Sequence, residues 1–151
     1  MIKGQLLRSI CLMSKFNEIS IIDDDKIQVF IFHKFIGKMD LTDQVSSFTN
    51  GKEAFDAMKK RSENSLAYPE IIFLDLNMPV WDGWQFFEEF QKLPNADKVT
   101  IYILTSSLSS EDYQRASSLG LKDYYLNKPL KYEELEDLLK HEQRLSPITD
   151  K

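Results

Sequence analysis

The stretch that most constrains the fold runs from Ile71 to Pro79 and reads IIFLDLNMP. Its first four residues are apolar, and they run directly into the carboxylate of Asp75. A short, uniformly apolar run that begins with β-branched residues is typical of a strand buried on both faces of a parallel sheet. The carboxyl edge of such a sheet is where open α/β proteins carry their ligand sites. Taken alone, Asp75 is equally compatible with a residue that merely starts a turn.

The same alternation of strand and helix signals recurs along the chain. A predicted helix with apolar residues at helical spacing follows each of the five predicted strands. Gly37 is expected to end the first helix. Ser109 to Asp112 resemble a capping box that begins the fourth helix. The predicted strands span residues 19–22, 45–48, 71–74, 99–104 and 124–127, and the helices residues 25–37, 52–61, 84–92, 109–120 and 132–141. This order predicts an α/β fold with a parallel sheet, right-handed crossovers and helices on both faces.

Bulk composition indicates one ordinary soluble domain. A chain of 151 residues fits a single domain with a sizeable core. The net charge of -5 argues against direct DNA binding, because duplex phosphates attract basic surfaces. One cysteine, Cys11, excludes an internal disulfide and a multi-cysteine metal site, which fits a reducing compartment. No stretch approaches the roughly 20 apolar residues of a membrane helix, so a cytoplasmic protein without membrane attachment is expected.

We expect the folded domain to occupy residues 16–142. Residues 1–15 are predicted to be an N-terminal leader, since Met13-Ser14-Lys15 resembles a natural chain start. Residues 143–151, which contain Pro147, are predicted to be a C-terminal tail.

Polar side chains follow four of the five predicted strands. They are Asp23 and Asp24, Asp75, Thr105, and Lys128. In a parallel sheet all these ends meet at one edge, so we expect the side chains to converge. Two carboxylates about 4 Å apart repel by roughly 4 kcal/mol at an effective dielectric of 20. The cluster therefore needs either a proton or a cation, and oxygen ligands of this kind suit Mg²⁺.

This set of residues suits an anion that becomes attached at Asp75. The carboxylate would be the nucleophile, and the metal ion would screen the incoming charge. Lys128 and Thr105 would hold the phosphoryl oxygens.

The chain resembles the receiver domains of bacterial two-component response regulators. The resemblance covers about residues 17–141 and is carried by four motifs in order. They are Ile21-Ile22-Asp23-Asp24-Asp25, Leu74-Asp75-Leu76-Asn77-Met78-Pro79 with Asp82-Gly83, Leu104-Thr105-Ser106, and Tyr125 three residues before Lys128-Pro129. The resemblance implies a flavodoxin-like (βα)5 fold, a three-layer sandwich around a five-stranded parallel sheet of order 2-1-3-4-5.

The resemblance also implies a role for the acidic residues. Asp75 would accept a phosphoryl group from a phosphohistidine of a sensor histidine kinase or a histidine phosphotransfer protein. Asp24 and Asp75 would bind Mg²⁺ through their side chains, Asn77 through its backbone carbonyl, and Asp23 mainly through water.

The remaining implied roles concern the switch. Lys128 would contact the phosphoryl group, and Pro129 would set its loop, through a cis bond. Thr105 and Tyr125 would be the switch pair that changes the face formed by the fourth helix, fifth strand and fifth helix. That face would contact an unknown output protein or a second copy in a phosphorylation-dependent homodimer.

Two features depart from the usual receiver pattern, and two further positions bear on how long the phosphoryl group would last. The run from Gly120 to Lys128 is about one residue longer, so an irregular end of the fourth helix is expected. Lys131 stands where a Ser or Thr cap is common, which weakens the start of the last helix. Ser107 and Asn77 flank the path of an attacking water in this family, where both positions tune dephosphorylation.

The sequence favours a stand-alone receiver, which would be a signalling phosphoacceptor that assists its own phosphorylation and dephosphorylation and not an enzyme. Two other function classes fit the residues less well. An aspartate-nucleophile phosphatase of haloacid dehalogenase type usually has a second Asp two residues after the nucleophile, where this chain has Asn77. A flavodoxin-like FMN carrier needs a phosphate-binding loop after the first strand, where Asp23-Asp24-Asp25 would repel phosphate. The stand-alone reading rests on the roughly ten residues that follow the last predicted helix.

Overall fold

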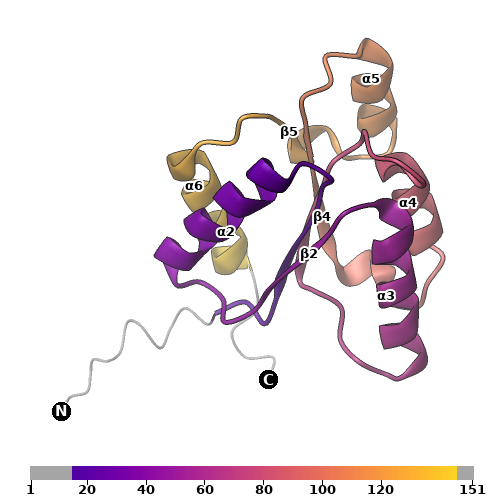
Figure 1. Cartoon of the computed structure of the whole chain (residues 1–151), viewed down its shortest axis with the longest axis horizontal. Helices are drawn as coiled ribbons and strands as arrows, with labels where there is room; N and C mark the ends of the chain where they lie inside the picture. The colour runs from indigo at the N-terminus through magenta and orange to yellow at the C-terminus, as the bar shows by residue number, and fades with distance from the viewer. Residues whose placement is uncertain (1–14, 146–151) are drawn as a thin grey trace.

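The computed structural model describes residues 15–145 and shows strands alternating with helices throughout (Figure 1). The strands are β1 (Ile19–Ile22), β2 (Val45–Phe48), β3 (Ile71–Leu74), β4 (Thr100–Thr105) and β5 (Tyr125–Asn127). The α-helices are α2 (Lys26–Met39), α3 (Gly51–Glu63), α4 (Gly83–Phe90), α5 (Ser110–Ser118) and α6 (Tyr132–Leu145). Two short 3₁₀ turns, η1 (Ala96–Lys98) and η2 (Lys122–Tyr124), precede β4 and β5.

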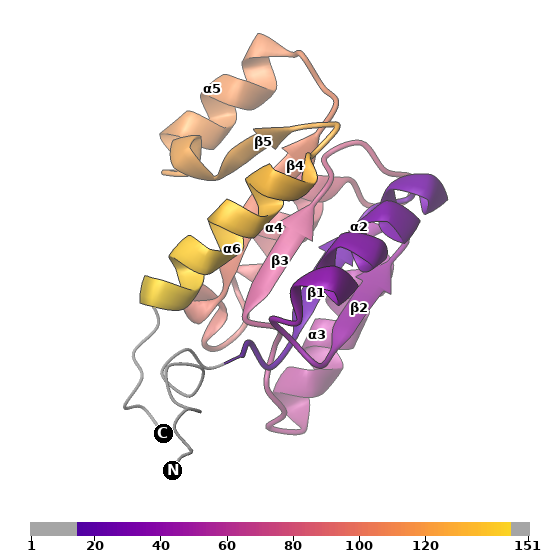
Figure 2. The ribbon, with the colours of Figure 1, turned by 90° about the vertical axis from the view of Figure 1, so that its left-hand side faces the viewer.

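The strands form one parallel sheet of order β2-β1-β3-β4-β5, as the resemblance implied (Figure 2). Strands β1 and β3 pair in register, with Ile19 opposite Ile71 and Ile22 opposite Leu74. The residues that follow these two strands, Asp23 and Asp75, therefore leave the sheet side by side. The chain order and pairing are those of the flavodoxin-like fold.

Helices cover both faces of the sheet, which makes a three-layer sandwich. Helices α2 and α6 lie on one face, and α3, α4 and α5 lie on the other (Figure 1). Alternate residues of β3 explain why the strand is apolar throughout. Ile72 and Leu74 join the core under α3 and α4, whereas Ile71 and Phe73 join the core under α2 and α6.

Side-chain caps begin four of the helices at the carboxyl edge of the sheet. Asp25 accepts from the backbone N–H groups of Ile27 and Gln28 and so starts α2. The other three caps are Asn50 for α3, Asp82 for α4 and Ser109 for α5. These caps fix where each helix leaves the loop that carries polar strand-end residues.

Helix ends were predicted less accurately than helix starts. The prediction that Gly37 ends the first helix is wrong, because α2 continues to Met39 and ends at Asp40, which has φ 55°. Asp tolerates this left-handed conformation better than most residues, so it replaces the expected glycine. The last helix, α6, passes its predicted end at His141 and continues to Leu145, three residues into the predicted tail.

The irregular fourth-helix end that the sequence predicted is present. Helix α5 stops at Ser118, Gly120 has φ 79°, and η2 inserts a 3₁₀ turn before β5. At the start of α6 the Lys131 N–H donates to the Glu134 carboxylate at 3.3 Å, which is half of a capping box without its Ser or Thr. The leader predicted for residues 1–15 lies outside the described residues except for Lys15. None of the described helices is long and apolar enough to span a bilayer.

Candidate functional site

Asp75 lies directly after β3, and its side chain is almost completely buried, with 5% of the residue exposed. The chain then turns back so tightly that Gly83 packs against it. A Cβ on Gly83 would lie 2.3 Å from the Asp75 carbonyl oxygen, a distance that no side chain tolerates. The Gly83 N–H donates to the Leu76 carbonyl at 3.0 Å. The Asp-Gly pair of the motif is thus explained by a cap at Asp82 and close backbone packing at Gly83.

Two further carboxylates, those of Asp23 and Asp24, lie beside Asp75, as the sequence predicted. Oxygen atoms of Asp23, Asp24 and Asp75 all lie within 4.8 Å of one another. The Asp75 N–H donates to the Ile22 carbonyl at 2.9 Å, so the parallel pairing of β1 with β3 creates this proximity. Asp23 is buried, with 1% exposed, whereas Asp24 is exposed to solvent.

Lys128 extends from the end of β5 into the acidic cluster. Its Nζ lies 2.7 Å from Asp23 Oδ2 and 3.6 Å from Asp75 Oδ2. Its backbone N–H donates to the Thr105 carbonyl at 3.0 Å, which ties the β5 loop to the end of β4. The Lys128–Pro129 peptide bond is cis, as the resemblance implied. The sequence predicted that Lys128 contacts a phosphoryl group, and in the structure the carboxylate nearest to Lys128 is that of Asp23.

The cluster perturbs the acidity of Asp75. Burial, followed by the negative charge of Asp23, raises the pKa of Asp75 from 3.8 to about 6, although Lys128 and the Asn77 N–H counteract the rise. The Lys128 ammonium contacts Asp23 Oδ2 without the geometry of a hydrogen bond, and this buried oxygen has no hydrogen-bond donor among residues 15–145. A carboxylate oxygen without a hydrogen-bond donor thus lies beside two further carboxylates. Hard divalent cations prefer oxygen ligands of this kind, so these residues fit Mg²⁺.

The two predicted switch residues occupy neighbouring strands. Thr105, at the end of β4, is completely buried, and its Oγ1 accepts a hydrogen bond from the Ser107 N–H at 3.1 Å. Tyr125 begins β5, and its hydroxyl is buried with no hydrogen-bond partner in the described part of the chain. Its ring packs edge-on against Tyr113 with centroids 5.4 Å apart. Burial, with a contribution from the charge of Asp112, raises the pKa of Tyr125.

A contact that sequence reasoning missed joins the loop after Asp75 to the start of α3. The Gly51 N–H donates to the Trp81 carbonyl at 3.1 Å, and the Trp81 ring lies 5.2 Å from the Phe55 ring and 5.2 Å from Lys52 Nζ. The Asn-Gly pair at residues 50–51 signalled only a turn. A Cβ on Gly51 would come within 2.9 Å of the Trp81 carbonyl, so the glycine permits this close approach.

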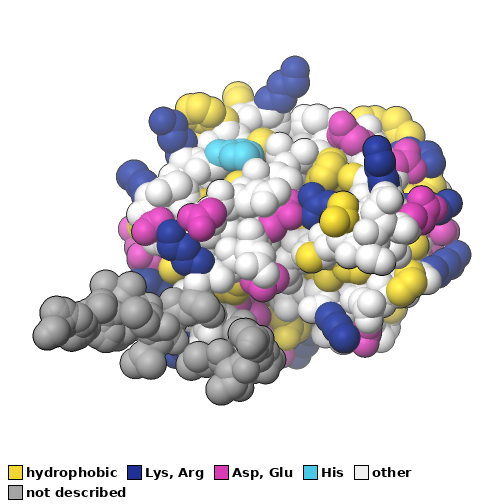
Figure 3. All heavy atoms as spheres, turned by 90° about the horizontal axis from the view of Figure 1, so that it is seen from below, with side chains coloured by type: hydrophobic (Ala, Val, Ile, Leu, Met, Phe, Trp, Pro, Cys, Tyr) yellow, Lys and Arg dark blue, Asp and Glu magenta, His cyan; other side chains and the backbone are white. Residues whose placement is uncertain are grey.

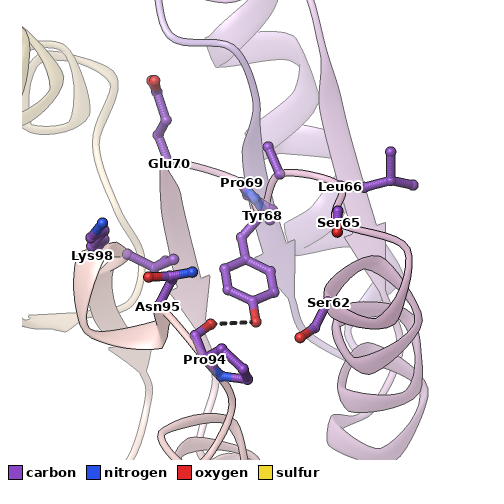
Figure 4. A pocket seen from close by; sticks show the side chains of 11 residues that line it. Ser62, Ser65, Leu66, Tyr68, Pro69, Glu70, Pro94, Asn95 and Lys98 are labelled. Carbon is purple, nitrogen blue, oxygen red and sulfur yellow. Dashed lines mark hydrogen bonds between the residues drawn. The ribbon is translucent and has the colours of Figure 1, made fainter. Parts of the chain in front are cut away.

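Two cavities differ in their relation to the acidic cluster. A cavity of about 210 Å³ opens beside Asp23 and is lined by Asp23, Lys26, Val29, Ser47, Phe48 and Thr49. A larger one of about 690 Å³ lies between the loop before β3 and the loop before β4, where the Tyr68 hydroxyl donates to the Pro94 carbonyl at 2.8 Å (Figure 4). These loops lead into the strands, so this cavity lies at the edge opposite the carboxylates. Figure 3 views the molecule from below Figure 1 and shows acidic and basic side chains interspersed on that face.

The fold and the site together define a class of protein. A parallel sheet of order 2-1-3-4-5 carries a buried aspartate, two further acids, a hydroxyl and an amine at its carboxyl edge. This arrangement is that of a flavodoxin-like α/β protein with an acidic strand-end site. Residues 19–140 match the family described as the response regulator receiver domain, and the chain belongs to this family.

Solved structures agree with the family. A two-component response regulator from Cytophaga hutchinsonii superposes with a TM-score of 0.75 at 28% identity, covering 87% of this chain and 99% of that one. A response regulator receiver protein from Dyadobacter fermentans superposes with a TM-score of 0.66 at 27% identity, covering 82% and 95%. The chain of 151 residues thus has the size of a single receiver domain. The phosphatase alternative has no support from these similarities.

Curated relatives differ widely in length. The probable methanogenesis regulatory protein FilR2 of Methanothrix harundinacea is 24% identical over 117 residues, which cover 78% of this chain and 75% of FilR2. Hybrid signal transduction histidine kinase L of Dictyostelium discoideum is 27% identical over 126 residues, which cover 82% of this chain but 7% of that protein. Homology therefore concerns the receiver unit.

Proposed function

We propose that this receiver takes a phosphoryl group onto Asp75 from a phosphohistidine of a sensor histidine kinase or a histidine phosphotransfer protein. The observation that carries the proposal is the buried Asp75 carboxylate, with Asp23 and Asp24 within 4.8 Å and Lys128 Nζ at 3.6 Å. A structural aspartate would not require two neighbouring acids that raise its pKa. Membership of the receiver family agrees with this role.

The reaction is a transfer of the phosphoryl group from nitrogen to oxygen. A carboxylate oxygen of Asp75 forms a P–O bond while the P–N bond to the donor imidazole breaks, and the imidazole retains the electron pair of that bond. The Lys128 ammonium, which contacts Asp23 and lies near Asp75, is suited to balance the charge of a phosphoryl oxygen. The Thr105 hydroxyl would donate to another phosphoryl oxygen. Hydrolysis by water would later return Asp75 to a free carboxylate.

Mg²⁺ would be held by Asp23, Asp24, Asp75 and the backbone carbonyl of Asn77. When bound, the ion would neutralise charge on the carboxylates and on the phosphoryl group. The chain prepares this site by burying Asp23 and Asp75 side by side and leaving Asp24 exposed at the entrance. The net repulsion among these acids supplies the drive for a cation.

Output would follow a change at Thr105 and Tyr125. Movement of Thr105 toward the phosphoryl group would alter the space beside the half-buried Tyr125 ring, and Pro129 would keep the β5 loop in place. The face formed by α5, β5 and α6 would then contact an output protein or a second copy. Leu108 and Leu119, which flank the two ends of α5, are exposed apolar side chains. This signalling would take place in the cytoplasm. The domain would not bind DNA directly, in keeping with its net charge of -5.

Phosphorylation with acetyl phosphate tests the assignment. With Mg²⁺, the protein should gain one acid-stable, hydroxylamine-labile phosphoryl group, and Asp75→Asn should abolish it. Asp25→Asn is the matched control, because Asn keeps the N-cap of α2 and the side chain lies outside the cluster. Label that persists in Asp75→Asn, or that disappears in Asp25→Asn with an intact fold, contradicts the assignment.

A further inference from the structure

Asp112, in the first turn of α5, is the centre of a hydrogen-bond network that joins two helices and a site loop. Its Oδ1 accepts from the indole N–H of Trp84 in α4 at 2.9 Å. Its Oδ2 accepts from the Ser107 hydroxyl at 3.0 Å. Both carboxylate oxygens are therefore engaged by side chains from other segments, 28 and 5 residues away in sequence.

Asp112 does not perform the local role that its position predicts. In a capping box the third residue of the helix returns its side chain to the N–H of the cap residue. Here Ser109 caps the Asp112 N–H at 3.2 Å, but the Ser109 N–H donates to Ser107 Oγ, also at 3.2 Å. The capping box is thus only half formed, and the Asp112 carboxylate turns toward Trp84 and Ser107 instead.

The network reaches the active-site hydroxyl through Ser107. The Ser107 N–H donates to Thr105 Oγ1 at 3.1 Å, and the Ser107 hydroxyl is bound by Asp112. Position and orientation of the buried Thr105 hydroxyl consequently depend on where Ser107 is held. Burial, and after it the charge of Asp112, raises the pKa of Tyr125.

The α4 end of the network is closely packed. Trp84 is buried, and its ring packs against Phe87 with centroids 6.4 Å apart. The guanidinium of Arg115 covers this ring at 4.8 Å and also forms an ion pair with Glu88 of α4. Packing thus surrounds the indole that donates to Asp112, and Asp112 in turn accepts from Ser107 in the loop that follows β4.

We propose that Asp112, held by the Trp84 indole, is a positioning residue that places Ser107 and thereby the Thr105 hydroxyl for phosphoryl chemistry at Asp75. The inference rests on the proposed function, because it assigns Thr105 to the phosphoryl group. It makes the packing between α4 and α5 a determinant of phosphorylation rate, although neither Asp112 nor Trp84 touches the carboxylates.

Rates of phosphorylation by acetyl phosphate at saturating Mg²⁺ test the inference. Asp112→Ala and Trp84→Phe should each slow phosphoryl gain by about fivefold, the factor that one net hydrogen bond represents. The double variant should be no slower than the slower single variant, because both changes break one path. Asp112→Asn should restore a rate near that of the wild type, since the amide oxygen still accepts from Trp84 and the amide N–H can donate to Ser107 Oγ.

Glu111→Ala is the matched control. Glu111 shares the first turn of α5, is exposed, and forms no hydrogen bond or ion pair within residues 15–145, so its removal deletes a helix-terminal charge and leaves the network intact. Its rate should stay within about twofold of wild type. Mg²⁺ affinity, measured by thermal shift, should be unchanged in Asp112→Ala.

The outcomes separate the two proposals. A wild-type protein that gains no label at Asp75 overturns the proposed function. A labelled wild type with Asp112→Ala as fast as Glu111→Ala overturns the inference alone. Equal slowing in Asp112→Ala and Asp112→Asn also overturns it, because the charge of Asp112 would then matter rather than its contacts.

Discussion

Asp75→Asn should stabilise the metal-free protein while destroying its phosphoacceptor. The Asp75 carboxylate is buried beside Asp23 and Asp24, and these surroundings raise its pKa from 3.8 to about 6. A carboxyl group with a higher pKa in the folded state than in the unfolded state destabilises the fold once it is ionised. Asn has nearly the same shape and carries no charge, so the variant avoids this cost.

The magnitude follows from the two pKa values. A rise from 3.8 to about 6 corresponds to about 3 kcal/mol at 1.4 kcal/mol per pH unit. Loss of the contact with Lys128 and relaxation around the site reduce the gain, so we expect the free energy of unfolding to increase by about 1–3 kcal/mol at about pH 7.5. The cost is fully present above about pH 6 and disappears below the unfolded value of 3.8. The advantage of the variant should therefore shrink as the pH falls from about 6 to about 4.

Urea unfolding in the presence of a chelator, followed at several pH values, measures this difference. Saturating Mg²⁺ should stabilise the wild type more than the variant, because the ion binds the folded carboxylates. Asp25→Asn should change the free energy of unfolding little at any pH, since that carboxylate is exposed and caps α2. A less stable Asp75→Asn, or a gain that is independent of pH, would refute the electrostatic reasoning.

Two further substitutions probe the neighbours of Asp75. Lys128→Ala removes the ammonium 2.7 Å from Asp23 Oδ2 and should lower the free energy of unfolding in chelator by about 3 kcal/mol. Mg²⁺ should restore part of this loss. Unchanged stability in chelator would contradict the role of the ion pair. Gly83→Ala should cost about 3 kcal/mol or more in urea unfolding and impair labelling, because its Cβ would lie 2.3 Å from the Asp75 carbonyl; an unperturbed variant would show that the turn can relax.

The sequence predicted the central strands well because their pattern leaves little choice. Ile71 to Leu74 are apolar at every position, which is typical of a strand covered on both faces, and both cores indeed contain alternate residues of β3. Helix starts at Asp25 and Ser109 were equally local, since a cap is decided within three residues. The end of α2 was not decided locally. Gly37 has open space around it, so nothing there forces the helix to stop. The helix continues to Met39 because α2 packs on the sheet through Phe32 and Ile36.

For the candidate site, too, some features follow from the sequence and others depend on how the elements pack. Sequence alone determined that Asp23, Asp24, Asp75, Thr105 and Lys128 lie at the ends of strands, and parallel pairing made their convergence necessary. It predicted a capping role for Asp112, which the half-formed box only partly bears out.

Only the tertiary structure decided which of these groups touch. Lys128 lies closer to Asp23 than to Asp75, and the Asp112 carboxylate turns to a tryptophan 28 residues away. Local patterns specify the residues within a few positions of one another and the face of an element that is buried. Contacts between side chains on different elements depend on how helices pack on the sheet, and that packing is a property of the whole chain.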